Sequence, residues 1–81
     1  MILWNDGKGR RLDLENPNPG QRPGQLHVQD QKHNIYKDGK LFGKNSKTGN
    51  YDVPAPREIN KLLEDPKFQK AIKKGKEYLG E

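Results

Sequence analysis

Short segments in which apolar and polar residues alternate occupy residues 10–52, and glycine, proline, asparagine and aspartate separate them. A period of two places successive side chains on opposite faces of a strand, so this part of the 81-residue chain predicts a small antiparallel sheet. After Asp52 the apolar residues take helical spacing. The two patterns together predict an α+β fold, a twisted antiparallel sheet of about four or five strands with two short C-terminal helices.

The predicted strands are residues 11–15, 25–30, 34–37, 40–42 and 51–53. Within them Leu12, Leu14, Leu26 and Val28 are expected to face the core, and His27 to face away from it. Residues 16–24 contain three prolines and predict a stiff loop. Asp-Gly at 38–39 predicts a tight hairpin turn, and prolines at 54 and 56 are expected to end the sheet.

The helical part divides at the Asp65-Pro66 pair, which is expected to cap the second helix. A first helix is predicted over 57–64, beginning after Pro56, and the second is expected to stop at Gly80. The apolar stripe expected on the second helix consists of Phe68, Ala71, Ile72, Tyr78 and Leu79. Its lysines are expected to face water, with RNA contact as the alternative.

The composition of the chain excludes several classes of protein. Only 28% of the residues are hydrophobic, and the mean hydropathy is -1.28, so one domain with a thin core is expected. The sequence has no cysteine and two histidines, which excludes disulfides and thiolate zinc sites and leaves no metal or cofactor expected. No apolar run approaches the roughly 20 residues that span a bilayer, so no membrane binding is expected.

The balance of charge favours a polyanionic partner. Sixteen lysines and arginines against eleven aspartates and glutamates give a net charge of +5 and an isoelectric point near 9.6. A basic chain of this size is attracted to nucleic acid, and the alternative is a basic surface that only aids solubility. A membrane surface fits less well, because the basic residues do not line one face of a long helix.

Four residues are candidates for the metal-free cleavage of RNA. That reaction needs a base for the 2′-hydroxyl proton, an acid for the leaving oxygen and a cation for the charge on phosphorus. Asp13 and Glu15 share one face of a predicted strand, His27 lies on the next strand, and Arg57 begins a helix. If the two strands pair, a carboxylate comes near His27. The alternatives are a solvated strand face, an idle surface histidine, and an ion pair for Arg57.

RNA contacts are predicted for a second group of residues, which lie mostly in turns. Tyr36 and Tyr51 are alternatives for base stacking, although tyrosine in a thin sheet more often belongs to the core. Gly7-Lys8-Gly9 is too short for a nucleotide-binding loop, which argues against ATP chemistry. The predicted RNA-binding residues are Lys8, Arg10, Arg11, His33, Lys40, Lys44 and Lys47.

Four stretches occur in an order that carries a resemblance. They are a Trp followed by Asp-Gly-Lys-Gly-Arg-Arg at 4–11, Gly-Gln-Leu-His at 24–27, Ser-Lys-Thr-Gly-Asn at 46–50, and Ala-Pro-Arg-Glu-Ile-Asn-Lys-Leu-Leu at 55–63. Their order resembles the cytotoxic ribonuclease domain of the colicins that cleave 16S ribosomal RNA, and related contact-dependent inhibition and polymorphic toxin tips. The resemblance covers residues 4–63.

The resemblance implies a twisted sheet whose early strands carry carboxylates and a histidine, with a late arginine. Asp13 or Glu15 then stands for the early carboxylate, His27 for a carboxylate after Gly-x-Leu, and Arg57 for the late arginine. The family histidine precedes the Gly-x-Leu stretch, where this chain has Arg22 and Pro23. His27 would therefore combine or exchange roles, and tRNA stays open as a substrate beside ribosomal RNA.

The same resemblance implies a biological setting. The chain is expected to be one C-terminal toxin domain, residues 1–81, of a larger secreted or cell-surface protein that acts in the cytoplasm of a target cell. Such toxins are made with an immunity protein, and a basic toxin implies an acidic one. Two other functions stay open, a non-catalytic RNA-binding module and a metal-dependent DNA nuclease that uses His27 and His33.

Overall fold

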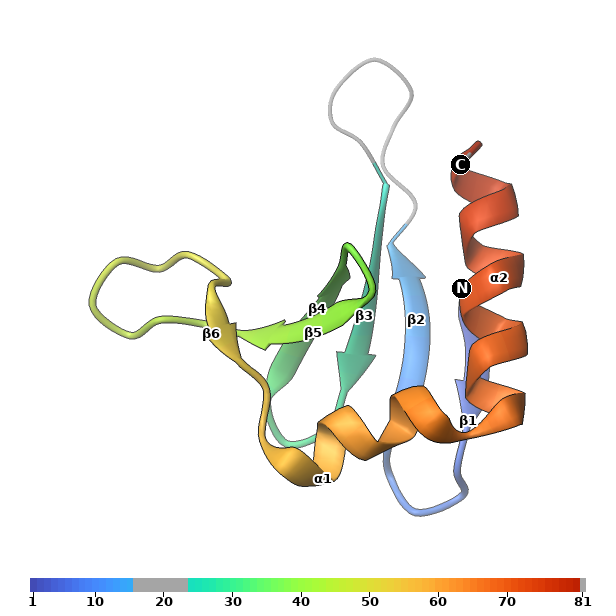
Figure 1. Ribbon diagram of the computed structural model, residues 1–81, viewed down its shortest axis with the longest axis horizontal. Coiled ribbons are helices and arrows are strands. Elements are labelled where there is room, and N and C mark those ends of the chain that lie inside the picture. The colour runs from blue at the N-terminus through green and yellow to red at the C-terminus, as the bar shows by residue number, and fades with distance from the viewer. Residues whose placement is uncertain (16–23, 81) are drawn as a thin grey trace.

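The computed structural model describes residues 1–15 and 24–80 (Figure 1). The described part contains one six-stranded antiparallel sheet whose strand order follows the chain. Its strands are β1 (Ile2–Asn5), β2 (Arg11–Glu15), β3 (Gln25–Gln29), β4 (His33–Lys37), β5 (Lys40–Gly43) and β6 (Val53–Pro54). The predicted α+β class is confirmed. Most of the predicted proline-rich loop, residues 16–23, lies outside the described residues.

The first strand is the one that the sequence pattern did not reveal. β1 pairs with β2, with an irregular register between Ile2 and Trp4. Its sequence places three apolar residues in a row, so it lacks the alternation by which a half-buried strand is found. The ring of Trp4 meets that of Phe68 edge to face, with centroids 5.1 Å apart, and Leu3 also packs against the core. Tertiary packing therefore makes this segment a strand.

The last three strands follow the turn chemistry of the sequence, with one correction. Asp38 and Gly39 both have positive φ, 52° and 81°, as the predicted hairpin turn requires. Pro54 does not end the sheet but lies in β6, paired with Phe42. β6 is an edge strand, where a proline without an N–H group leaves no ladder bond unmade. The predicted strand thus shifts towards the C-terminus and excludes Tyr51.

The helices are α1 (Arg57–Asn60), the 3₁₀ turn η1 (Lys61–Glu64) and α2 (Pro66–Leu79). The first predicted helix is therefore one α turn that tightens into a 3₁₀ turn. Asp65 caps α2, because its Oδ1 accepts a hydrogen bond from the Lys67 amide at 2.8 Å, and Gly80 ends the helix with φ 79°. Tyr78 is 57% exposed, which corrects its predicted place on the apolar stripe. The stripe runs through buried Gly75 instead, and Tyr78 lies at its edge.

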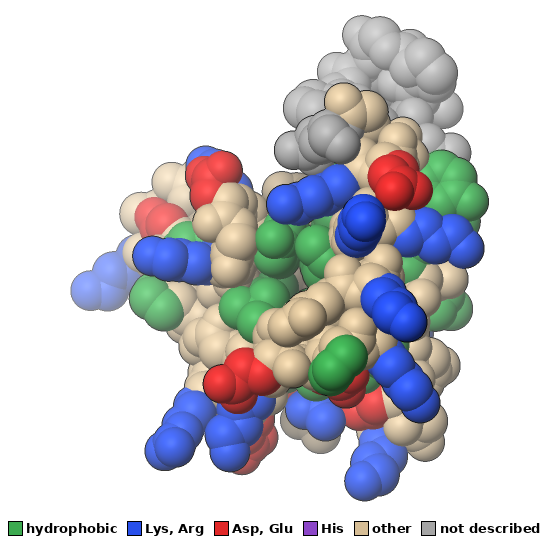
Figure 2. Space-filling view, turned by 45° about the vertical axis from the view of Figure 1, so that its right-hand side comes forward, with side chains coloured by type: hydrophobic (Ala, Val, Ile, Leu, Met, Phe, Trp, Pro, Cys, Tyr) green, Lys and Arg blue, Asp and Glu red, His purple; other side chains and the backbone are tan. Residues whose placement is uncertain are grey.

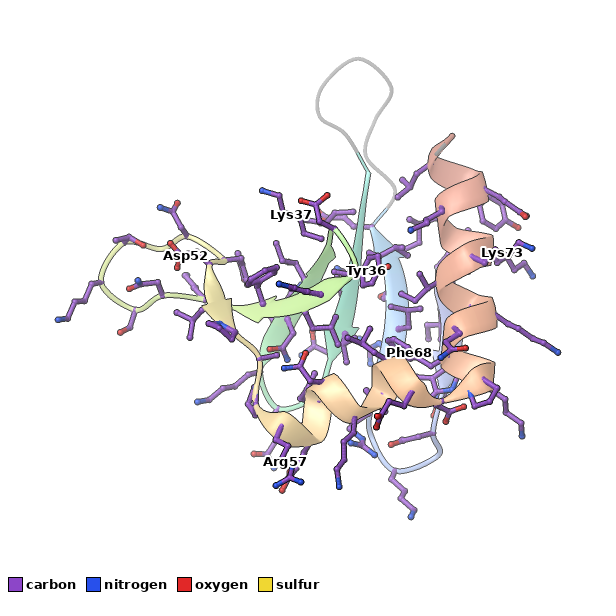
Figure 3. All side chains as sticks on the ribbon, viewed as in Figure 1. Tyr36, Lys37, Asp52, Arg57, Phe68 and Lys73 are labelled. Atoms are coloured by element: carbon purple, nitrogen blue, oxygen red, sulfur yellow. The ribbon has the colours of Figure 1, made fainter. Side chains whose placement is uncertain are left out.

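The helices cover one face of the sheet (Figure 1). The core between the two layers in the described residues consists of Leu12, Leu14, Leu26, Val28, Leu41, Ala55, Ile59, Leu62, Phe68, Ala71 and Ile72. Tyr36 packs against this core, and Lys76 Nζ lies 5.5 Å from the centre of its ring. Figure 3 shows Phe68 and Tyr36 in the space between α2 and the sheet. None of the helices of the described chain is long and apolar enough to cross a membrane.

Candidate functional site on the open sheet face

Asp13, His27, Ile35 and Phe42 form one row across β2, β3, β4 and β5. They alternate with the leucines and valine of the core and so belong to the sheet face opposite the helices. Asp13 and His27 are direct partners in the register, and Asp13 Oδ2 lies 3.7 Å from His27 Nε2. The pairing predicted from sequence therefore brings a carboxylate beside the histidine.

The Asp13 carboxylate gathers positive charge. Its Oδ1 accepts a hydrogen bond from the Met1 ammonium at 2.8 Å, and its Oδ2 lies 3.9 Å from Arg11 Nε. Partial burial raises the pKa of this carboxyl, but the Met1 ammonium outweighs it by its hydrogen bond and its charge, with smaller effects from His27 and Arg11. The net result is a lowered pKa, so Asp13 is ionised at neutral pH.

His27 is buried, although it lies on the face away from the core. The residue is 9% exposed, so it is not the surface histidine of the alternative interpretation, although it does face away from the core as the alternation predicts. Alternation in a strand tells which face a side chain occupies but not whether that face is covered. Nδ1 of His27 is buried and has no hydrogen-bond partner among the described residues. Such an atom costs about 1–3 kcal/mol in most settings and calls for a reason.

Burial also determines the charge of His27. Loss of solvent lowers the pKa of its imidazole, and the neighbouring His33 lowers it further. The carboxylates of Asp13 and Glu15 raise that pKa, but not enough to reverse the effect of burial. The net pKa lies below the ordinary value of 6.5, so the ring is mainly neutral at pH 7.

His33 is the residue that joins this pair to the rest of the open face. Its ring centroid lies 4.1 Å from that of His27, with the rings tilted by 50°. The ring of Tyr51 meets the ring of His33 edge to face, with the two centroids 6.0 Å apart. The sequence suggested Tyr51 for base stacking and His33 for RNA binding, but it did not predict the contact between the two histidines. The signal was the short turn at 30–32, which pairs His33 with Gln29 and so sets it diagonal to His27.

Of the other two predicted catalytic residues, Glu15 lies near the Asp13–His27 pair and Arg57 does not. Glu15 is on the same face of β2 as Asp13, two residues along, and its charge acts on the His27 ring. Arg57 begins α1, is exposed, and points away from the sheet (Figure 3). The side-chain cation beside Asp13 is instead Arg11, which is 44% exposed and lies there together with the Met1 ammonium. Arg11 was predicted from sequence as an RNA-binding residue.

The predicted RNA-binding residues are spread over the molecule. Lys8 lies in the β1–β2 turn, and Lys44 and Lys47 lie in the loop before β6, which projects from another side of the sheet (Figure 1). Arg10 is already paired, because its Nε donates to Asp6 Oδ2 at 2.7 Å. Lys40 begins β5 after the hairpin turn. Figure 2 shows further lysines and arginines scattered over the face that α2 presents.

In residues 1–15 and 24–80, no group of three or more His, Cys, Asp or Glu side chains is arranged to hold a metal ion. Comparison of the chain with protein families, with curated proteins and with solved structures gives no match.

Proposed function

We propose that this chain is the ribonuclease domain of a bacterial toxin, a metal-independent endoribonuclease that cleaves structured RNA. The observation that carries the proposal is the contact of buried, neutral His27 with ionised Asp13 on a face that the helices leave open. Arg11 and His33 adjoin this pair. The four side chains supply the base, the acid and the cation that cleavage of RNA by its own 2′-hydroxyl requires.

In the proposed reaction His27 is the base. Its Nε2 lies 3.7 Å from Asp13, too far for a hydrogen bond, so its lone pair can accept the 2′-hydroxyl proton. The 2′-oxygen then attacks phosphorus while the bond from phosphorus to the 5′-oxygen breaks. The Asp13 carboxylate stabilises the imidazolium that forms. Burial keeps the His27 ring neutral, and a neutral ring can accept a proton at pH 7. This is a functional reason for a buried Nδ1 that has no partner among the described residues.

Two neighbours complete the reaction. His33 donates a proton to the leaving 5′-oxygen, since it is exposed and lies against the His27 ring. Arg11 stabilises the charge on the phosphorane. Glu15 assists by favouring the protonated form of His27. Arg57, the cation expected from sequence, has no role in this reaction centre, because it is exposed and points away from the sheet.

The substrate and the setting follow from charge and from the sequence resemblance. A net charge of +5 attracts RNA, and 16S ribosomal RNA is the first candidate, with tRNA the second. An acidic immunity protein would neutralise the domain in the producing cell, with association steered by charge. Delivery from the producer and action in the cytoplasm of the target cell belong to the same proposal.

The test is cleavage of intact ribosomes and of total tRNA by the purified chain in EDTA. We expect discrete fragments from one of the two RNAs, and we expect His27→Ala to slow the cut by about 10²–10⁴-fold because it removes the general base. Asp13→Asn should slow it as well. The control is Lys74→Ala on the exposed face of α2, which should cut like the parent chain.

Binding without cleavage of either RNA would overturn the proposal and favour the non-catalytic RNA-binding module. Cleavage that EDTA abolishes would overturn it in favour of a metal-dependent nuclease. Full cleavage by folded His27→Ala would contradict the assignment of the base.

A further inference from the structure

A cavity of about 460 Å³ opens at the end of the sheet where β4 begins and β5 ends. Its volume falls within the roughly 300–1,000 Å³ of pockets that bind small ligands. His33 and Tyr51 supply aromatic rings to its lining, Lys32 and Lys44 supply positive charge, and β6 supplies an apolar wall. None of the described carboxylates lines it.

A polar group that can read a base also lies in this lining. Asn34 is 3% exposed, and its Oδ1 lies 3.4 Å from the position that a Cβ on Gly43 would occupy. Asn34 and Gly43 both line the cavity. Because Gly43 has no side chain, nothing on that residue covers the Asn34 carboxamide. An asparagine carboxamide has both donors and an acceptor, the pattern that base edges match.

The lining as a whole matches one chemical class. Aromatic rings stack on the face of a base, lysines pair with phosphate, and a carboxamide bonds to a base edge. An acidic peptide would use the lysines but not the rings. A purely apolar ligand would leave the lysines without a role. A nucleotide of unpaired RNA uses all three kinds of group.

The position of the cavity relates it to the proposed reaction centre. His33 belongs to the cavity lining and also contacts the ring of His27, with centroids 4.1 Å apart. A nucleotide in the cavity would therefore be adjacent to a phosphate at the Asp13–His27 pair.

We infer that this cavity binds a single unpaired nucleotide of the RNA substrate, with its base against Tyr51 and His33 and its phosphate beside Lys32 and Lys44. The inference rests on the proposed ribonuclease function for placing that nucleotide next to the scissile phosphate. It makes the pocket a determinant of which nucleotide flanks the cut.

The experiment uses probes that the enzyme cannot cleave, four 2′-O-methyl RNA trinucleotides of A, C, G or U, titrated into the whole chain and followed by NMR of the aromatic side chains. We expect the His33 and Tyr51 signals to shift for at least one probe. Tyr51→Ala should weaken its affinity roughly tenfold, as expected for the loss of one stacked base. The matched control is Tyr78→Ala, because Tyr78 is an exposed tyrosine on α2.

Binding and cleavage are separate readouts, so the two proposals fail in different ways. Equal affinity of Tyr51→Ala and Tyr78→Ala, or no shift of His33 with any probe, would overturn the pocket even if the chain cuts RNA. Loss of affinity in Tyr51→Ala alone, in a chain that cuts no RNA, would support the pocket and overturn the ribonuclease.

Discussion

His27 determines much of the chemistry that this small sheet can support. Its imidazole is almost enclosed, its Nδ1 has no partner among the described residues, and its other nitrogen faces a carboxylate that is already paired with cations. Protonation of this ring places a charge where little water can reach it, so burial outweighs the attraction of Asp13.

The stability of the protein should therefore fall on mild acidification. The pKa of His27 is lower in the folded chain than its ordinary value of 6.5, so the unfolded chain takes up the proton first. The stability that the folded chain gains from a neutral His27 is fully present above pH 6.5. It is lost as the pH falls from 6.5 through the lowered pKa of the folded chain. Chemical denaturation at pH 7.5 and at pH 5 measures it. The His27→Phe variant should lose less stability between those two pH values than the parent chain.

An equal loss of stability in the parent chain and in His27→Phe would contradict the assigned direction of the shift. Asp13 does not confuse the comparison, because the pKa of its carboxyl is lowered from 3.8 and its contribution is lost only in stronger acid.

The sequence predicted part of this site and could not predict the rest. Alternation in two adjacent segments was enough to bring Asp13 to His27, since strand pairing is local. The burial of His27 and the contact with His33 depend on the turn at 30–32 and on the twist of the sheet, which alternation does not report. The direction in which Arg57 points depends on how α1 leaves the sheet, for which the sequence carried no local signal.

Helix α2 fits closely against the sheet at Gly75. A Cβ at this position would clash with Leu26 Cδ2 and would lie 2.9 Å from Leu3 Cδ1, closer than ordinary contacts come. A leucine can move its tip, but Leu26 is 2% exposed and has little room. The glycine thus allows the helix to lie close to β1 and β3, at the expense of helix propensity.

Gly75→Ala should destabilise the protein by about 1 kcal/mol. Overpacking costs roughly 1–3 kcal/mol, and the better helix propensity of alanine returns about 1 kcal/mol. The measurement is urea denaturation, with Lys74→Ala as the control at an exposed position on the same helix turn. A Gly75→Ala variant more stable than its parent would contradict the close contact.

Elements with local signals were predicted from the sequence, and elements that tertiary contacts create were not. The alternation of Leu12 and Leu14 gave β2, and Asp38-Gly39 gave the β4–β5 hairpin. β1 has no alternation and depends on Trp4 meeting Phe68 of α2. Tyr78 was misplaced because the position facing the core one turn earlier is a glycine, which carries no apolar signal in the sequence.

The molecule as a whole is two layers with different tasks. The helices bury one face of the sheet and supply nearly half of the core residues, while the other face carries Asp13 and His27. Such a division leaves most of the apolar packing to one side and lets charged groups collect on the other, where the exposed Arg11 and His33 can meet a polyanion. The excess of positive charge extends beyond that face, as the lysines of α2 show (Figure 2).

The most direct test of the ribonuclease proposal is the chemistry of the fragment ends that this chain leaves on RNA in the presence of EDTA. Attack by the 2′-oxygen must produce a 2′,3′-cyclic phosphate on one fragment and a 5′-hydroxyl on the other. The proposed mechanism predicts these ends from the parent chain and almost none from His27→Ala. Fragments that carry a 5′-phosphate would contradict this mechanism, because that end forms when water attacks the phosphorus and the 3′-oxygen leaves.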